Sequence, residues 1–178
     1  MKRIYDPIHH FIELSTAEAR LLDAPPLQRL RRLRQLGLAY LAYPSAEHSR
    51  FTHALGAFAV GSQVFDAVAS RESGYFSGAD DRDYQRRLLR AALLLHDIGH
   101  GPFSHACEAV LGVAHEQRTR DILDLPAMQG HLYELEVETR DVADLIVGAG
   151  ENRYPVLTQI VSGPNFDADR MDYLLRDA

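Results

Sequence analysis

The residues best suited to chemistry lie where an apolar stretch ends in a histidine and an aspartate. His96 and Asp97 directly follow the apolar run 91–95, so we expect an imidazole and a carboxylate in a low-dielectric setting, where an unpaired anion is costly. A divalent cation offsets that cost, and these donors suit Mn, Fe, Ni, Co or Zn. A single histidine there is more often a structural residue. The chain has nine histidines, however, and those that favour a site are His48, His53, His96, His100, His105 and His115.

Other catalytic patterns are not supported by the sequence. Gly99 and Gly101 lack the third glycine and the preceding strand of a dinucleotide-binding fingerprint, and no Walker loop occurs. Ser104 lacks the strand–turn–helix context of a hydrolase nucleophile. Cys107 follows a helical apolar pattern that predicts a core residue, and as the lone cysteine it favours a reducing compartment. Nucleophilic catalysis by serine or cysteine is therefore not predicted.

Hydrophobic periodicity predicts the elements that must position these side chains. Residues 3–14 predict a small strand or hairpin, and the segment 74–83 predicts a loop. Leucines spaced every three residues after Pro25 predict an amphipathic helix that ends before Gly37. Ser104 is expected to cap a helix that follows it. The other predicted helices are periodic apolar segments, and the whole set covers 25–36, 46–69, 84–96, 115–123, 139–147, 155–161 and 167–178.

These elements define an all-α fold class. No 20-to-50-residue repeat and no alternation of strands and helices occurs, and 178 residues suit one domain with its own core. We therefore expect a single helical bundle over 1–178 with a small N-terminal strand or hairpin. The last predicted helix has no glycine, proline or cationic terminator, which favours a chain that continues in a longer protein.

Composition bears on partners and location. The net charge of −6 disfavours general binding to nucleic acid or to an anionic membrane. Two arginine clusters, within 29–34 and 82–90, are either solvated helix faces or local cation sites. No signal-peptide run occurs, and the apolar runs are too short to span a bilayer. We expect a cytoplasmic protein that does not enter a membrane.

Several motifs occur in an order typical of one family. The segment 94–105, with Leu-His-Asp-Ile-Gly-His-Gly, resembles the HD superfamily of metal-dependent phosphohydrolases. Together with Asp6-Pro7-Ile8-His9, 28–37, 48–56, His115-Glu116 and 167–173, it resembles deoxynucleoside triphosphate (dNTP) triphosphohydrolases of the SAM-and-HD-domain type. The resemblance implies a helical HD domain that binds one divalent ion, Mn, Fe, Ni, Co, Zn or Mg. The metal ligands that it implies are His53, His96, Asp97 and Asp169.

The same resemblance implies a reaction and the residues that perform it. Water attacks the α-phosphorus of a dNTP, and the products are a deoxynucleoside and inorganic triphosphate. The implied catalytic residues, which supply or orient the proton for the leaving 5′ oxygen, are His100, His105, His115 and Glu108. Arg50 and Arg170 are implied phosphate contacts, and Gln35 and Tyr173 are implied sugar contacts. Two alternatives stay open: Asp169 as a carboxylate favoured by a helix N-terminus, and Gln35 as a helix-end polar residue.

The resemblance also implies partners. Relatives are often oligomers activated by a guanine nucleotide, so we expect a homo-oligomer, dimer or tetramer, with Lys2, Asp23 and Arg31 as effector contacts. Asp23 lies two residues before Pro25, and an aspartate in such a place is more often a helix cap, so Asp23 keeps that alternative. Two other functions remain open for the chain. One is another HD-type nucleotide phosphohydrolase, acting on a monophosphate, cyclic or alarmone nucleotide, and the other is a nucleotide-binding module with little turnover.

Overall fold

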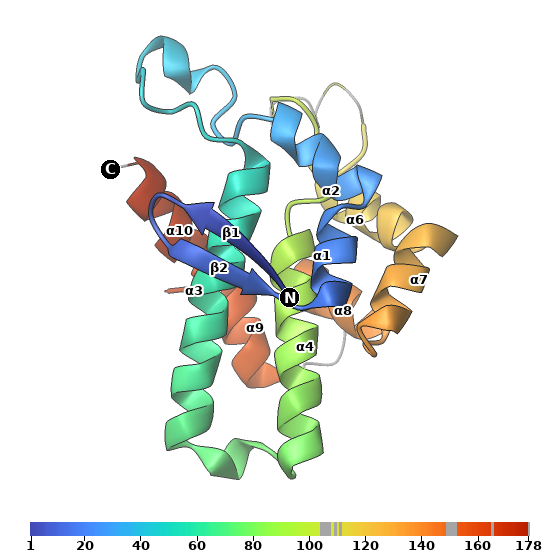
Figure 1. Ribbon diagram of the computed structural model, residues 1–178. Helices are drawn as coiled ribbons and strands as arrows, with labels where there is room; N and C mark the ends of the chain where they lie inside the picture. Colours follow the sequence, from blue (N-terminus) through green and yellow to red (C-terminus); the bar gives the residue numbers. More distant parts are fainter. Residues whose placement is uncertain (104–107, 109, 111, 149–152, 165, 178) are drawn as a thin grey trace.

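The computed structural model describes residues 1–103, 108, 110, 112–148, 153–164 and 166–177. Over these residues the secondary-structure elements are all helices apart from one N-terminal β-hairpin, which confirms the all-α prediction (Figure 1). None of the helices described there is both long and apolar enough to cross a membrane. The elements are β1 (Lys2–Asp6), β2 (His10–Leu14), α1 (Thr16–Leu22), α2 (Pro25–Arg29), α3 (Arg50–Arg71), α4 (Ala79–Leu95), α6 (His115–Leu123), α7 (Pro126–Glu134), α8 (Thr139–Val147), α9 (Pro155–Ser162) and α10 (Ala168–Asp177).

Helices α3 and α4 lie side by side and run in opposite directions through the centre of the molecule (Figure 1). The small residues of α3 permit this close approach: a Cβ at Gly61 would overlap the Leu93 side chain of α4. The side chain of Ser49 caps α3 by accepting a hydrogen bond from the backbone N–H of Thr52. The apolar end of α4 is buried, as the run 91–95 predicts. His96 and Asp97, which follow this helix, are therefore placed next to the buried core.

The hairpin lies across α3, and its turn reaches α10 (Figure 1). Strands β1 and β2 pair antiparallel from Lys2 opposite Leu14 to Asp6 opposite His10. A carboxylate oxygen of Asp6 accepts hydrogen bonds from the backbone N–H groups of Ile8 (2.9 Å) and His9 (3.0 Å), which fixes the turn. The predicted N-terminal hairpin is thus confirmed, and its turn is held against the body of the protein.

The predicted helix over 25–36 is wrong in its second half. The α-helix ends at Arg29, a 3₁₀ turn follows over 30–32, and the chain then pairs with the residues just before α3. The backbone N–H of Gln35 donates to His48 O (3.1 Å), and that of Arg50 donates to Leu33 O (2.8 Å). Leucines three residues apart also suit a 3₁₀ turn, and these long-range backbone bonds decide against helix.

Other boundaries shift by smaller amounts. The long helix begins at Arg50 rather than at 46, because Ser49 has extended backbone and caps it. Helix α4 begins at Ala79, inside the predicted loop. Helices α1 and α7 were not predicted. The helix that Ser104 was expected to cap, and the core position expected of Cys107, lie outside the described residues.

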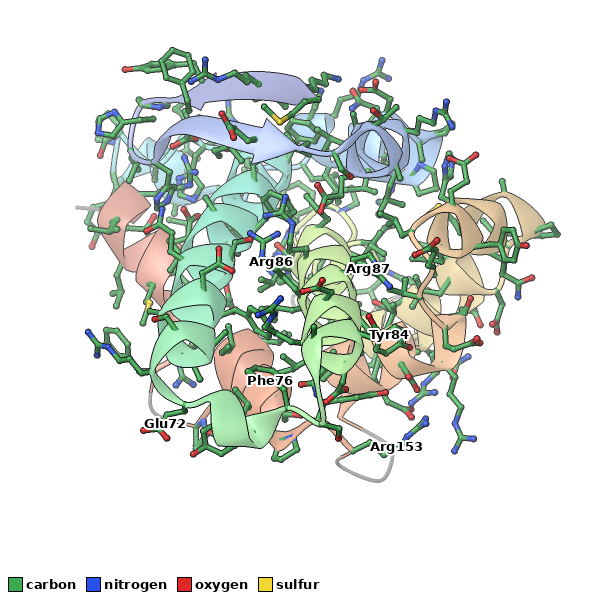
Figure 2. The ribbon with its side chains drawn as sticks, turned by 60° about the horizontal axis from the view of Figure 1, so that its bottom comes forward. Glu72, Phe76, Tyr84, Arg86, Arg87 and Arg153 are labelled. Atoms are coloured by element: carbon green, nitrogen blue, oxygen red, sulfur yellow. The ribbon has the colours of Figure 1, made fainter. Side chains whose placement is uncertain are left out.

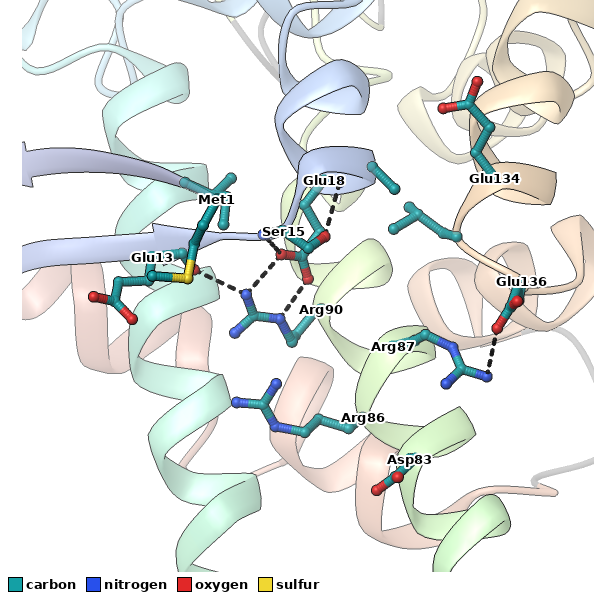
Figure 3. Close-up of a pocket in the computed structure, with 13 residues that line it drawn as sticks. Met1, Glu13, Ser15, Glu18, Asp83, Arg86, Arg87, Arg90, Glu134 and Glu136 are labelled. Atoms are coloured by element: carbon teal, nitrogen blue, oxygen red, sulfur yellow. Dashed lines mark hydrogen bonds and ion pairs between the residues drawn. The ribbon is translucent and has the colours of Figure 1, made fainter.

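Two buried carboxylates tie the helices together. Glu18 of α1 forms a two-pronged ion pair with Arg90 of α4, with Oε1–Nε at 2.5 Å and Oε2–NH2 at 2.8 Å (Figure 3). Asp141 of α8 accepts hydrogen bonds from the hydroxyl of Tyr84 (2.9 Å) and from the guanidinium of Arg153 (2.5 Å), two residues labelled in Figure 2. These contacts join α4 to the N-terminal and C-terminal parts of the chain.

Candidate metal centre

Three side chains that are distant in the sequence meet at the C-terminal end of α4. His53 comes from α3, His96 directly follows α4, and Asp169 lies in the first turn of α10. The Nε2 atoms of His53 and His96 are 3.1 Å apart, and His53 Nε2 lies 2.8 Å from Asp169 Oδ1. These three residues form a group whose donor atoms could hold one metal ion.

The Nδ1 atom of each imidazole forms a hydrogen bond, and this bond directs the Nε2 atom toward the group. His96 Nδ1 lies 2.8 Å from the carbonyl oxygen of Leu93. A carbonyl only accepts, so Nδ1 carries the proton. His53 Nδ1 lies 2.8 Å from Asp172 Oδ2, a carboxylate oxygen that likewise accepts. With Nδ1 protonated, each ring in its neutral form, the form that binds a metal, presents an Nε2 lone pair beside the Asp169 carboxylate. Three acceptors facing one point fit a cation, and the donor set suits a first-row divalent metal.

The electrostatics of His53 also favour positive charge at this point. Burial alone would lower the pKa of this imidazole, but hydrogen bonds to Asp169 and Asp172 and the charge of Asp97 raise it to about 9. Burial would raise the pKa of Asp169, whereas its contact with His53 and the charge of His96 lower it. The carboxylates around His53 therefore create a field that stabilises a cation.

Asp97 lies beside the group of three rather than within it. Its Oδ1 is 3.8 Å from His96 Nε2, and its Oδ2 is 3.9 Å from His53 Nε2. The same Oδ2 accepts a 2.6 Å bond from Arg50 NH1. Burial would raise the pKa of Asp97, but the charges of His96, Arg50 and His53 hold it well below its usual range. Asp97 is therefore an anion placed next to both imidazoles.

A second cluster adjoins the first through Asp97. His100 Nε2 lies 3.5 Å from Asp97 Oδ1, and the His100 and His115 rings stack with centroids 4.1 Å apart. His115 Nδ1 lies 2.9 Å from Glu108 Oε1. His100, Glu108 and His115 are close enough to hold an ion themselves. The structure thus brings together three of the four predicted catalytic residues, and the fourth, His105, lies outside the described residues.

The residues predicted to contact phosphate and sugar differ in how close they lie to the two clusters. Arg50 is buried and bound to Asp97, next to both clusters. The backbone N–H of Gln35 donates to His48 O, and the buried Oε1 of Gln35 has no hydrogen-bond partner among the described residues.

The other two predicted contacts lie on α10. Tyr173 follows Asp169 by four residues, on the same helix face. Arg170 instead donates to the carbonyl oxygens of Gly163 (3.2 Å) and Pro164 (2.8 Å).

The predicted effector residues split into two places. Lys2 Nζ lies 2.9 Å from Asp23 Oδ1, so the strand and the end of α1 meet there. Arg31 packs its guanidinium 3.6 Å from the centre of the Phe51 ring and donates from Nε to Gln28 (2.7 Å). Asp23 is the C-cap residue of α1, where its backbone N–H donates to the carbonyl oxygens of Ala19 and Leu21, and it does not cap α2, whose N-cap is Ala24.

Sequence reasoning missed the residues that support His53. Asp172 is fully buried and binds His53, His9 and Arg176. A Cβ at Gly56 of α3 would overlap the Asp172 carboxylate, so only glycine leaves room for it. His9 and Asp172 both fall in motifs named above, but nothing in those motifs assigns a partner to either. No local signal marks either residue, because each stands near other polar residues in the sequence.

A polar pocket of about 720 Å³ lies elsewhere, between β2, α1, α4 and α7 (Figure 3). None of its lining residues is a predicted site residue. Its arginines are engaged by carboxylates: Arg86 by Asp66 (2.7 Å), Arg87 by Glu136 (3.4 Å), and Arg90 by Glu18. The arginines of this pocket therefore form ion pairs that join neighbouring elements.

The helical fold and the His-Asp clusters define a class of protein that sequence comparison also identifies. The HD domain family model matches residues 50–149. The chain belongs to the HD domain family.

The chain is also similar to individual proteins over part of their length. The chain is 40% identical over 179 residues to the uncharacterized protein YwfO of Bacillus subtilis, covering 97% of this chain and 39% of that protein. It is 41% identical over 105 residues to the deoxynucleoside triphosphate triphosphohydrolase SAMHD1 of Homo sapiens, covering 59% of this chain and 16% of that protein.

Two solved structures have the same fold over nearly the whole chain. A hypothetical protein from Aquifex aeolicus superimposes with a TM-score of 0.82 at 34% identity, covering 99% of this chain and 46% of that one. A phosphohydrolase from Bacteroides thetaiotaomicron gives a TM-score of 0.80 at 37% identity, covering 99% and 41%. This chain spans less than half the length of each of these relatives.

Proposed function

We propose that this chain is the catalytic part of a metal-dependent hydrolase that converts dNTPs to deoxynucleosides and inorganic triphosphate. The observation that carries the proposal is the meeting of His53, His96 and Asp169 from separate elements, with Asp97 and Arg50 beside them. Membership of the HD domain family and the phosphohydrolase among the similar structures support a hydrolase. The partial match to SAMHD1 supports the dNTP substrate.

In this proposal the residues divide into those that hold the metal and those that act on the substrate. His53, His96 and Asp169 hold one divalent ion of Mn, Fe, Ni, Co, Zn or Mg. Asp97 is the fourth ligand in this proposal, from its place beside that group. The ion supplies activation of the attacking water and offsets charge on phosphoryl oxygens. Arg50 binds the polyphosphate: a guanidinium has five N–H donors, so it can bind Asp97 and a phosphate together. Gln35 and Tyr173 contact the sugar, and Arg170 turns from its carbonyl partners to a phosphate.

The bond changes require one proton acceptor and one proton donor. The water oxygen forms a bond to the α-phosphorus as the bond from that phosphorus to the 5′ oxygen breaks. The proton that the water loses passes to solvent, and the 5′ oxygen gains a proton from the donor. The stacked pair His100 and His115 lies next to Asp97. In this proposal the reacting phosphate binds close to Asp97 and therefore close to this pair. Glu108 holds His115 through Nδ1, so His115 Nε2 is directed as a proton donor to the leaving oxygen. His105 remains a predicted member of this set.

Regulation and assembly follow the same proposal. A guanine nucleotide would bind where Lys2 and Asp23 meet, with Arg31 contributing after it leaves the Phe51 ring. A homo-oligomer, dimer or tetramer, would complete that site. Activity assays with and without GTP or dGTP, run beside size-exclusion chromatography with light scattering, test both points. No activation and a monomer at every nucleotide concentration would contradict them.

Product analysis tests the central proposal. The metal-loaded chain is incubated with each dNTP and each ribonucleotide triphosphate, and the products are separated by ion-exchange chromatography. We expect deoxynucleoside and triphosphate from dNTPs only, and none of either from the His96→Ala variant. Release of monophosphate or pyrophosphate would instead indicate another HD-type phosphohydrolase. Metal binding without any hydrolysis would indicate a nucleotide-binding module.

A further inference from the structure

The turn of the N-terminal hairpin contacts the residue that orients His53. His9 lies at the end of this turn, and its Nε2 is 2.6 Å from Asp172 Oδ1 of α10. Both side chains are buried, with 7% of His9 and 0% of Asp172 exposed. An ionised carboxylate only accepts, so His9 donates this hydrogen bond from Nε2. The contact spans 163 residues of sequence.

The two oxygens of Asp172 serve different partners. Oδ2 accepts from His53 Nδ1 (2.8 Å) and from Arg176 Nε (2.7 Å), whereas Oδ1 accepts from His9. Rotation of the carboxylate would therefore break the bond to His9 as well as the bond to His53. Gly56 provides the space in which the carboxylate lies. His9 thus holds Oδ1 of Asp172, while the candidate metal ligand His53 is bound to Oδ2 of the same carboxylate.

The turn itself is held by the same set of charges. Arg176 NH2 donates to Asp6 Oδ2 (2.9 Å), while Asp6 Oδ1 accepts the backbone N–H of His9 (3.0 Å). Asp6 and Arg176 are each 4% exposed. The position of His9 is therefore set by its own backbone, by the hairpin register and by an ion pair to α10.

We infer that His9 is a positioning residue for the metal centre, acting through Asp172 to hold His53 with Nε2 directed at the ion. The inference rests on the proposed metal site and assigns the N-terminal hairpin a part in it. Outer contacts of this kind fix the tautomer and orientation of a ligating imidazole, and their loss typically weakens metal binding about 10–100-fold. The hairpin is then required for metal affinity as well as for packing.

A purely structural role for His9 makes a different prediction. If the contact only docks the hairpin, removing it lowers the stability of the metal-free chain and leaves metal affinity unchanged. If the contact positions His53, removing it weakens the metal even in a chain that stays folded. Metal affinity, measured apart from activity and from metal-free stability, separates the two roles.

The experiment compares four hairpin variants with the wild type by chelator competition, with Mn²⁺, Co²⁺ and Zn²⁺ titrated separately. His9→Ala removes the ring, His9→Phe keeps a ring without the N–H, and His9→Gln restores a donor at a similar reach. The matched control is His10→Asn: His10 is exposed in the adjacent position and has a positive φ of 59°, a conformation that asparagine tolerates. Circular dichroism in EDTA shows which variants are folded.

We expect the metal Kd to rise about 10–100-fold in His9→Ala and His9→Phe, to return toward the wild-type value in His9→Gln, and to stay unchanged in His10→Asn. If His9→Ala does not fold, His9→Phe decides. A folded His9→Phe chain with wild-type metal affinity would overturn the inference, as would an equal loss of affinity in His10→Asn. Metal binding without dNTP hydrolysis would contradict the proposed function and leave this inference intact, because affinity is the readout. A wild-type chain that binds none of these metals at a site lost in His96→Ala would overturn both.

Discussion

Gly56 shows how one small residue makes the metal centre possible. A Cβ there would overlap the Asp172 carboxylate and the Arg176 guanidinium. We expect Gly56→Ala to lower the free energy of unfolding by about 1–3 kcal/mol, as overpacking does, and to weaken metal binding because Asp172 must move away from His53. Urea unfolding and chelator competition measure the two effects.

The control is Gly130→Ala in α7, where an added Cβ meets nothing within 4 Å. We expect this variant to bind metal as the wild type does and to gain about 0.5–1 kcal/mol of stability, because alanine is the better helix former. Unchanged metal affinity in Gly56→Ala would show that Asp172 does not support the centre.

A matched pair of carboxylates tests the assignment of Asp169. Asp169 lies 2.8 Å from His53 Nε2, whereas Asp167 Oδ1 accepts the backbone N–H of Arg170 (2.7 Å) at the start of α10. Asparagine can replace aspartate in such a turn, so we expect Asp167→Asn to retain the metal. Asp169→Asn should weaken it by more than the ~10–100-fold loss typical of outer contacts. Metal content after gel filtration, measured by inductively coupled plasma mass spectrometry, distinguishes them; the reverse order would make Asp167 the ligand.

The residues that could be read from the sequence are those in a recognisable local pattern. His96, Asp97 and His100 lie within five positions of one another, and the family motif assigned His53 and Asp169 in advance. The support of His53 by Asp172 and His9 could not be predicted, because it depends on contacts across 119 and 163 residues. Periodicity and propensity contain no information about such pairs.

At the scale of elements, the ion pair between Glu18 and Arg90 joins α1 to α4 in the core (Figure 3). Burial would raise the pKa of Glu18, but the contact with Arg90 outweighs it, so the folded pKa is below the ordinary value of 4.5. A carboxyl whose pKa is depressed on folding adds stability above its unfolded pKa, and that stability is lost as the pH falls through the folded pKa. We expect Glu18→Gln to cost about 3–5 kcal/mol at pH 7, as loss of one partner of a buried pair does.

Urea unfolding of both chains in EDTA, from pH 7 down to pH 3, measures this effect. The difference in unfolding free energy between wild type and Glu18→Gln should be constant above pH 5 and shrink below pH 4.5. A suitable control is Glu134→Gln, whose ion pair with Arg20 is exposed and should contribute less than about 1 kcal/mol at any pH. A pH-independent difference for Glu18 would contradict the assignment.

The same helix shows why some elements were missed. Ser15 and Glu18 form a capping box, with Glu18 N–H donating to the Ser15 side chain (3.2 Å) and Ser15 N–H donating to Glu18 (2.7 Å). That spacing is visible in the sequence and could have located α1. The end of α2 at Arg29 could not be found in this way, because it depends on pairing of 33–35 with 48–50. Local patterns predict where helices begin better than they predict where backbone pairing with a distant segment ends them.

At the scale of the whole molecule, the candidate metal ligands come from α3, the end of α4 and α10, so a bound ion would join the first half of the chain to its last helix. A ligand that binds only the folded state stabilises it by about 2.7 kcal/mol at a concentration of 100 times Kd. For a domain of this size that corresponds to a rise in Tm of about 5–11 °C.

We expect this rise in Tm for the wild type with metal relative to the wild type in EDTA, measured by differential scanning calorimetry. His53→Ala and His96→Ala should lose the rise, whereas Gly130→Ala should keep it. An equal rise in all four chains would place the metal elsewhere, and no rise in the wild type would mean that these donors do not hold an ion in the folded state.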